Sequence, residues 1–204
     1  MGAAVNLSPR QFQQADLPAL VHSILIETSL SPARLELEIT ETALFEDLQR
    51  ALDALRRLRA LGVSIAMDDF GTGYSSLSSL QAFPFDKIKI DREFVEHLRE
   101  RKQAAMIVRS VLGLGKSLEI PVLAEGVETH EQLEFLRSIE CEEVQGYYFG
   151  RPASAEQIRQ IVASGCQSPH SGGSARRRGT LRENQAYGDC RRQGRSQAVT
   201  CGLA

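Results

Sequence analysis

Short runs of β-favouring residues alternate with longer amphipathic stretches along residues 1–165, and this alternation predicts an α/β fold with a parallel sheet. The runs are rich in Ile, Val and Leu, which is typical of strands buried on both faces. Each βα repeat takes about 25 to 35 residues, close to one-eighth of a (β/α)₈ barrel. About six of the eight βα units are present, so we expect an incomplete TIM-type barrel.

The strands are predicted at the short apolar runs. These are the run that ends at Val5 and Asn6, then Leu35–Ile39, Val63–Met67, Lys87–Ile90, Val122–Ala124 and Val144–Tyr148. The helices are predicted where apolar residues recur at three-to-four spacing, as at Leu48, Leu52 and Leu55. They are Leu17–Thr28, Leu48–Leu61, Glu93–Leu118, Glu131–Ile139 and Ala155–Ala163.

The composition is that of a soluble globular domain. The 204 residues include 24 Lys+Arg and 26 Asp+Glu, and the net charge of −2 gives no reason to expect a nucleic-acid partner. No apolar run approaches the length of a membrane span and the start does not read as a signal peptide, so we expect a cytoplasmic protein without a membrane segment. The four cysteines lack the close spacing of zinc sites and are expected to be reduced thiols.

The chain changes character near residue 165. Residues 1–165 contain 17 Lys+Arg and 24 Asp+Glu, whereas residues 166–204 contain 7 and 2 and lack Ile, Phe and Met. Such a segment buries too little apolar surface to offset the ordering of its backbone. We therefore expect a partial barrel over 1–165 and a basic, low-complexity, disordered tail over 166–204. The abrupt change suggests translation past a frameshift, which the coding DNA would test.

Polar residues follow nearly every predicted strand. Those that could bind a metal ion or move a proton are Asn6, Glu38, Glu41, Asp68, Asp69, Lys89, Asp91, Glu125, Glu128 and Gln145. In a barrel of parallel strands, the carboxyl ends of the strands meet on one face, where active sites are built. We therefore expect these residues to converge.

A single carboxylate at a strand end is more often a loop or capping residue than a ligand. The adjacent pair Asp68 and Asp69 is more informative, because two neighbouring anions repel and call for a cation. The expected ligands form an all-oxygen set suited to Mg²⁺ or Mn²⁺: Asn6, Glu38, Asp68, Asp69 and Glu125. Two such ions could clamp a phosphodiester for attack by a metal-bound hydroxide. The glycines of the following loop, Phe70–Ser76, permit close approach of a ligand.

Six runs occur in a distinctive order within residues 3–164. They are Asn6–Phe12, Glu38–Glu41, Asp68–Ser76, Lys87–Asp91, Ala124–Thr129 and Gln145–Pro152. In order and spacing they resemble the motifs of the EAL-domain cyclic di-GMP phosphodiesterases. The resemblance implies a modified (β/α)₈ barrel that uses two Mg²⁺ or Mn²⁺ ions to hydrolyse cyclic di-GMP to linear pGpG. It also implies a homodimer for the intact family domain.

The resemblance also implies roles for individual residues. Asn6, Glu38 and Asp68 would bind one metal ion, with Asp68 shared and Asp69 on the second ion. Glu125 would be a ligand or the base that activates water, and Lys89 would hold that water or offset charge on the phosphate. The remaining roles are support of the second metal by Asp91, a substrate contact by Gln145, and loop support by Glu41, Phe70, Gly71, Thr72 and Gly73.

The Glu-Ala-Leu motif of the family's first strand has no counterpart here. We therefore expect one ligand position to be vacant, about two strands to be missing, an exposed sheet edge and impaired activity. One alternative is a catalytically inactive module that binds cyclic di-GMP or another protein. Another is an enolase-like barrel enzyme, which the order of the Asp68–Ser76 and Ala124–Thr129 runs disfavours.

Overall fold

The computed structural model describes residues 2–12, 16–40, 43, 48–71, 83 and 85–163. The chain divides into two compact units with a boundary after Pro152. The first unit contains the sheet, and the second contains helix α9 (Ala155–Ala163). The predicted tail, 166–204, lies outside the described residues.

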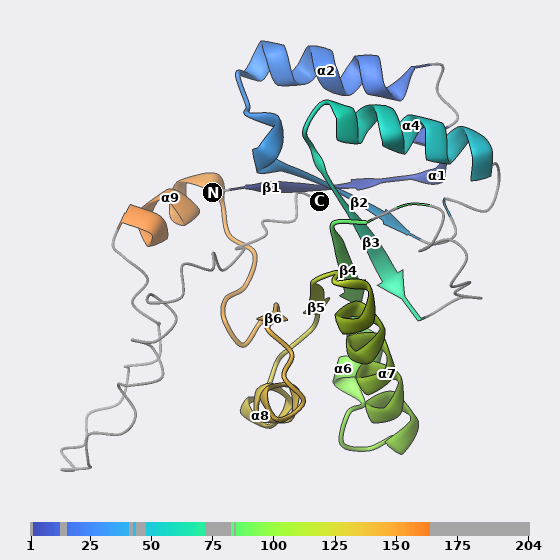
Figure 1. Ribbon diagram of the computed structural model, residues 1–204. Helices are drawn as coiled ribbons and strands as arrows, with labels where there is room; N and C mark the ends of the chain where they lie inside the picture. The colour runs from blue at the N-terminus through green and yellow to red at the C-terminus, as the bar shows by residue number, and fades with distance from the viewer. Residues whose placement is uncertain are drawn as a thin grey trace. The chain divides into compact units, whose positions relative to one another are not determined.

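The first unit is built on a parallel sheet (Figure 1). Its strands are β1 (Ala3–Leu7), β2 (Leu35–Thr40), β3 (Ser64–Phe70), β4 (Lys87–Ile90), β5 (Val122–Ala124) and β6 (Glu143–Val144). Over the described residues the sheet has six strands in sequence order, and each pairs in parallel with the next. This order is that of successive barrel strands, and the incomplete (β/α) barrel predicted from the sequence is confirmed.

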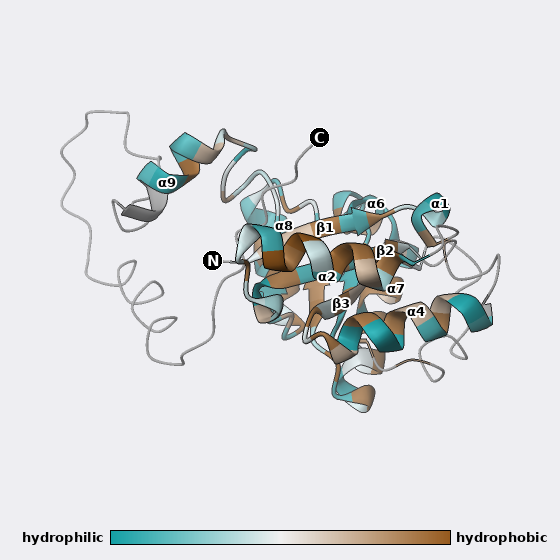
Figure 2. Ribbon diagram, turned by 90° about the horizontal axis from the view of Figure 1, so that it is seen from above, coloured by the Kyte–Doolittle hydropathy of each residue, from teal (hydrophilic) through white to brown (hydrophobic). Residues whose placement is uncertain are grey.

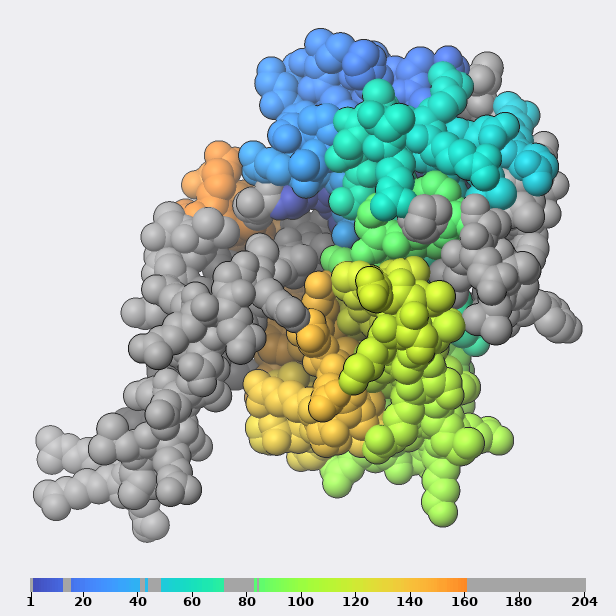
Figure 3. Space-filling view, in the orientation of Figure 1, coloured from blue at the N-terminus to red at the C-terminus, as the bar shows by residue number. Residues whose placement is uncertain are grey.

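Helices connect the strands. They are α1 (Pro9–Phe12), α2 (Leu17–Thr28), the 3₁₀ helix η1 (Pro32–Arg34), α4 (Leu48–Ala60), α6 (Arg92–Glu96), α7 (Lys102–Leu118) and α8 (His130–Ser138). The α2 helix begins where Asp16 accepts a hydrogen bond from the Ala19 amide, and it ends at Ser29 in the left-handed conformation. It packs beside α4 (Figures 1 and 3), where Arg57 lies 2.8 Å from the Asp16 carboxylate.

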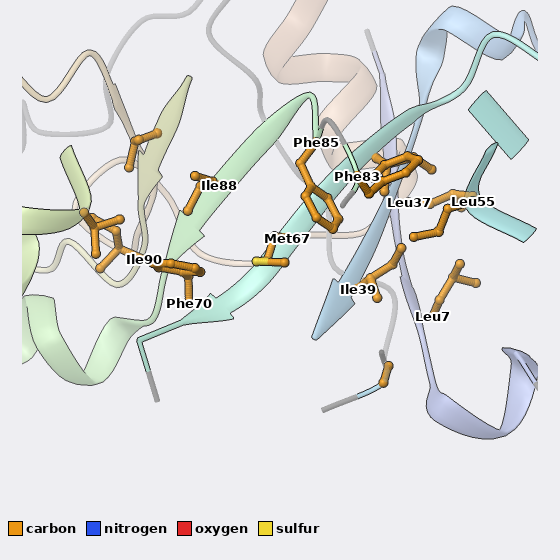
Figure 4. Close-up of a cluster of buried hydrophobic side chains, with 14 of the residues drawn as sticks. Leu7, Leu37, Ile39, Leu55, Met67, Phe70, Phe83, Phe85, Ile88 and Ile90 are labelled. Atoms are coloured by element: carbon orange, nitrogen blue, oxygen red, sulfur yellow. The ribbon is translucent and has the colours of Figure 1, made fainter. Parts of the chain in front are cut away.

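The hydrophobic core forms from one set of alternating strand residues and the helices, and Figure 4 shows part of it. Leu37 and Ile39 of β2 are buried in this core with Leu55 of α4. Neighbouring residues of a strand point to opposite faces of the sheet, so Glu38 lies on the other face. The alternation therefore separates a packed apolar face from a polar face, on which the candidate site lies.

Three elements depart most from the prediction. The strand expected over Val63–Met67 runs over Ser64–Phe70, so it includes Asp68 and Asp69 instead of ending before them. The helix expected over Glu93–Leu118 is interrupted, because the Glu100 and Arg101 amides both donate to the His97 carbonyl in a turn that buries Leu98. The strand expected over Val144–Tyr148 ends at Val144. Beyond it, the Gln145 amide still donates to the Ala124 carbonyl of β5, but the Gln145 carbonyl and the Tyr148 amide both bond to Val127 in the following loop.

Some large apolar side chains remain on the surface. Leu20, Ile24 and Ile26 of α2 are exposed, and the hydropathy colouring of Figure 2 shows the apolar character of this helix. None of the helices described is both long enough and apolar enough to cross a bilayer.

Candidate active site

An ion cluster centred on Lys89 lies on the polar face of the sheet. The Lys89 Nζ atom is 2.8 Å from Glu38 Oε1, 3.1 Å from Asp68 Oδ1 and 2.8 Å from Glu125 Oε1. These three carboxylates come from β2, β3 and the residue that follows β5. The structure therefore brings together four of the residues that the sequence predicted to converge.

The cluster is shielded from water. The side chains of Lys89 and Glu38 are 4% and 7% exposed, so the ion pairs between them are screened far less than surface pairs. Glu125 is held at the carboxyl end of β5, where its amide donates to the Ile90 carbonyl at 3.1 Å. Three carboxylates against one ammonium leave a surplus of negative charge in a partly desolvated place.

A bulge in β3 explains how two adjacent aspartates reach the same region. In a regular strand Asp68 and Asp69 would point to opposite faces. Here the pairing of β3 with β4 shifts register between Met67 and Phe70, and Asp69 has a φ of 54°. The Asp69 amide donates to the Asp68 carboxylate at 3.1 Å, which fixes this local conformation.

Asp69 is turned toward Asp91, the residue that follows β4. The two carboxyl groups share a hydrogen bond, and burial with the charges of Asp68 and Asp91 raises the pKa of Asp69 to about 6. Asp91 is also the N-cap of α6 and accepts a hydrogen bond from the Glu93 amide at 2.6 Å. Asp91 thus joins the start of α6 to this part of the site.

The charge imbalance also affects the other carboxyl groups. Burial raises the pKa of Glu38 and Glu125, although the Lys89 ammonium partly opposes the shift. Burial alone would lower the pKa of Lys89, but the Glu125 and Asp68 carboxylates raise it above its usual value. Lys89 is therefore fully charged at neutral pH, and the carboxylates around it would be stabilised by further positive charge.

Gln145 is placed beside the Glu125 loop by backbone contacts. Its amide donates to the Ala124 carbonyl at 2.9 Å, and its carbonyl accepts from the Val127 amide at 3.0 Å. The next residue, Gly146, lies so close to the Val127 backbone that a Cβ atom there would collide with it. The segment that follows β6 therefore fixes the loop that follows β5.

The other predicted site residues differ in how they are placed. Asn6 is exposed on β1 and pairs in register with Glu38, which puts it at the same level of the sheet. Phe70 is buried in the core at the end of β3, and Gly71 has a φ of 100° that favours glycine. Glu41, Thr72 and Gly73 lie outside the described residues.

The donor set suits a hard divalent cation, since all of its atoms are oxygens. In the part of the chain that is described, however, no three Asp, Glu, His or Cys side chains surround a point that could bind a metal ion. The point on which Glu38, Asp68 and Glu125 converge is that of the Lys89 ammonium. The donors thus fit a cation chemically, and the carboxylates would have to reorient from Lys89 to receive one.

Three charged residues on the same face were not predicted from the sequence. Glu36, Lys87 and Glu143 each stand two positions before a predicted site residue, and Lys87 pairs with both glutamates. The spacing of two residues could have predicted them, because residues two apart in a strand share a face.

The similarity to known proteins extends over most of the chain. The family model described as "EAL domain" matches residues 1–152. An uncharacterized signaling protein of Caulobacter vibrioides is 65% identical over 162 residues, which cover 79% of this chain and 20% of that protein. The bifunctional diguanylate cyclase/cyclic di-GMP phosphodiesterase MucR of Pseudomonas aeruginosa is 45% identical over 160 residues, which cover 78% of this chain and 23% of MucR.

Solved structures agree with this assignment. A MucR phosphodiesterase in complex with cyclic di-GMP has 44% identity and a TM-score of 0.74, and the match covers 77% of this chain and 64% of that one. Klebsiella pneumoniae BlrP1 with manganese and cyclic di-GMP at pH 9.0 has 37% identity and a TM-score of 0.70, over 74% and 39% of the two chains. The chain belongs to the EAL domain family.

Proposed function

We propose that this chain hydrolyses one phosphodiester bond of cyclic di-GMP to give linear pGpG, with two divalent cations as cofactors. The observation that carries the proposal is the convergence of Glu38, Asp68 and Glu125 on one point at the carboxyl ends of adjacent strands. The relatives add support, because MucR is named a cyclic di-GMP phosphodiesterase and its phosphodiesterase has been solved with cyclic di-GMP. The intact domain is proposed to act as a homodimer.

The residues that would bind the cations are Asn6, Glu38, Asp68, Asp69 and Glu125, with Asp91 supporting Asp69 through their shared hydrogen bond. Bound Mg²⁺ or Mn²⁺ would lower the pKa of a coordinated water and offset the charge that develops on the phosphate. Because the pKa values of Glu38 and Glu125 are raised in the cluster, added positive charge would stabilise both carboxylates.

Glu125 is the candidate general base, and Lys89 is the candidate group that offsets negative charge on the phosphate. Glu125 is half-buried at a strand end, and its Oε1 atom could accept a proton from the attacking water. Lys89 donates to Glu125 and so orients it, and the same ammonium could offset negative charge on the phosphate. Gln145, held beside the Glu125 loop, would contact the substrate.

A second candidate function is binding of cyclic di-GMP without turnover. It is favoured by the ion pairs that Lys89 makes with all three carboxylates, since these pairs compete with a metal ion for the same oxygens. Both functions require binding of cyclic di-GMP, but only hydrolysis produces pGpG.

The test is to incubate the purified chain with cyclic di-GMP and Mn²⁺ and to separate the products by chromatography. Asp68→Asn should abolish formation of pGpG, whereas the control Asp53→Asn, an exposed residue of α4 that pairs with Arg56, should leave it unchanged. Turnover retained in Asp68→Asn would exclude a metal-binding role for that residue. Binding of cyclic di-GMP without pGpG in the wild-type chain would favour the second candidate.

A further inference from the structure

A second ion cluster lies on the same face of the sheet as the candidate active site. The Lys87 Nζ atom is 3.1 Å from Glu36 Oε2 and 3.2 Å from Glu143 Oε2. The Lys87 side chain is 13% exposed, so water screens these pairs only partly. No residue of this cluster belongs to the set to which the proposed function assigns a role.

The two clusters form successive layers. Lys87 precedes Lys89 by two residues on β4, and Glu36 precedes Glu38 by two residues on β2. Residues two apart in a strand share a face and stand about 6.6 Å apart along it. The Lys87 cluster therefore lies one layer nearer the amino ends of the strands than the Lys89 cluster.

The Lys87 ammonium joins strands that are distant in the sheet. Glu36 is on β2 and Glu143 on β6, with β3, β4 and β5 between these strands. Adjacent strands are about 4.8 Å apart, so a flat sheet would place β2 and β6 about 19 Å from each other. One ammonium can pair with carboxylates from both strands because this face of the sheet is concave, and the two ion pairs stabilise that curvature.

The geometry of the Lys89 cluster depends on the same curvature. Lys89 pairs with Glu38 on β2, and it pairs with Glu125, whose loop is bound by the residues that follow β6. If β2 and β6 moved apart, Glu38 and the Glu125 loop would move apart with them. The two pairs of Lys87 thus act on β2, which carries Glu38, and on β6, whose following residues bind the Glu125 loop.

We propose that Lys87 is a positioning residue, whose ion pairs with Glu36 and Glu143 fix the curvature of the sheet and so the approach of Glu38 and Glu125 to Lys89. The importance of this positioning for turnover rests on the proposed function. The effect of Lys87 on the geometry of the Lys89 cluster does not rest on the proposed function. The positioning role and the proposed function can therefore be tested separately.

The test observes the Lys89 ammonium directly in the metal-free full chain. The sequence contains few lysines, namely Lys87, Lys89, Lys102 and Lys116, so the ¹⁵N signals of their ammonium groups can be resolved and assigned by substitution. An ammonium enclosed by three carboxylates exchanges its hydrogens slowly with water. Lys87→Met should accelerate the exchange of the Lys89 signal about 10-fold or more, as local opening does.

Two controls separate positioning from a general loss of stability. Lys116→Met removes an exposed ion pair with Glu140 and should leave the Lys89 signal unchanged. Lys87→Arg retains the charge and should restore much of the slow exchange. If Lys87→Met does not fold, Glu143→Gln, which removes one of the two pairs, should give a smaller acceleration in the same direction.

A Mn²⁺ titration of the same variants addresses the link to function. Lys87→Met should weaken Mn²⁺ binding about 10-fold, in the range seen when groups that orient metal ligands are lost. Unchanged exchange of the Lys89 signal in folded Lys87→Met would overturn the proposal. Accelerated exchange together with a wild-type chain that binds no Mn²⁺ would support the positioning role and contradict the proposed function.

Discussion

The Lys89 ammonium lies 2.8 Å from the Glu125 carboxylate, although the two residues are 36 positions apart in the sequence and helices α6 and α7 lie between them. The parallel pairing of β4 with β5 brings them together, since it sets Lys89 in register with Leu123 and places Glu125 just beyond the end of β5. The site is thus a product of strand order. Lys89 offsets only part of the negative charge of the site, since it has three anionic partners in the described structure.

Removal of Lys89 should leave three carboxylates without their cation. Lys89→Met is expected to lower the free energy of unfolding by about 3 kcal/mol, because an uncompensated buried charge is costly. Added Mn²⁺ should recover much of this loss by taking the place of the ammonium. Urea unfolding with Mn²⁺ and with a chelator measures both effects. A variant whose stability is the same under the two conditions would argue against cation binding at this point.

Gly146 should be intolerant of any side chain. Gly146→Ala forces a Cβ atom against the Val127 backbone and is expected to destabilise the chain by about 1–3 kcal/mol, the usual range for overpacking. Gly113 of α7 is the matched control, because a Cβ atom there meets nothing within 4 Å. Gly113→Ala should stabilise the helix by about 0.5–1 kcal/mol. Thermal unfolding of the two variants would refute this account if both changed stability in the same direction.

Cys141 should be an unreactive thiol in the folded chain. It is buried, its Sγ donates to the Glu143 carbonyl, and burial raises its pKa from 9.0 to about 11. At pH 8 the reactive thiolate is then about 100-fold scarcer than for an ordinary cysteine, and it should increase as the pH rises toward 11. The measurement is the rate of labelling by a thiol reagent after Cys166, Cys190 and Cys201 are replaced by Ser.

The control for this labelling is the same variant in urea, where Cys141 should react at the rate of a free thiol. Equal rates in the folded and unfolded chains would show that Cys141 is accessible, and that the packing around the start of β6 is looser than described.

The sequence predicted the sheet well because its strands are short apolar runs bounded by polar residues. The bounds of β4, β5 and α2 agree with the prediction and those of β1 and β2 are close to it, whereas β3 continues to Phe70 beyond its predicted end at Met67. The break between α6 and α7 was missed because the turn at His97 contains neither glycine nor proline and retains an apolar residue, Leu98. The end of β6 was missed because its backbone bonds go to a loop that is distant in sequence.

The candidate site was predicted as a set of residues, but its internal geometry was not. Strand order explains why Glu38, Asp68 and Glu125 meet, and that order follows from the βα alternation. The bulge that turns Asp69 toward Asp91 has no pattern in the sequence, since it depends on the pairing of β3 with β4. The position of Lys89 at the centre of the carboxylates likewise depends on the curvature of the sheet.

The most direct test of the central claim is equilibrium binding of Mn²⁺ to the metal-free chain, followed through the paramagnetic resonance signal of the free ion. We predict that the wild type and Asp53→Asn bind Mn²⁺ alike, and that Asp68→Asn binds it at least about 10-fold more weakly. Equal affinity in Asp68→Asn and the wild type, or no binding by either, would contradict the assignment of this carboxylate cluster as a divalent metal site.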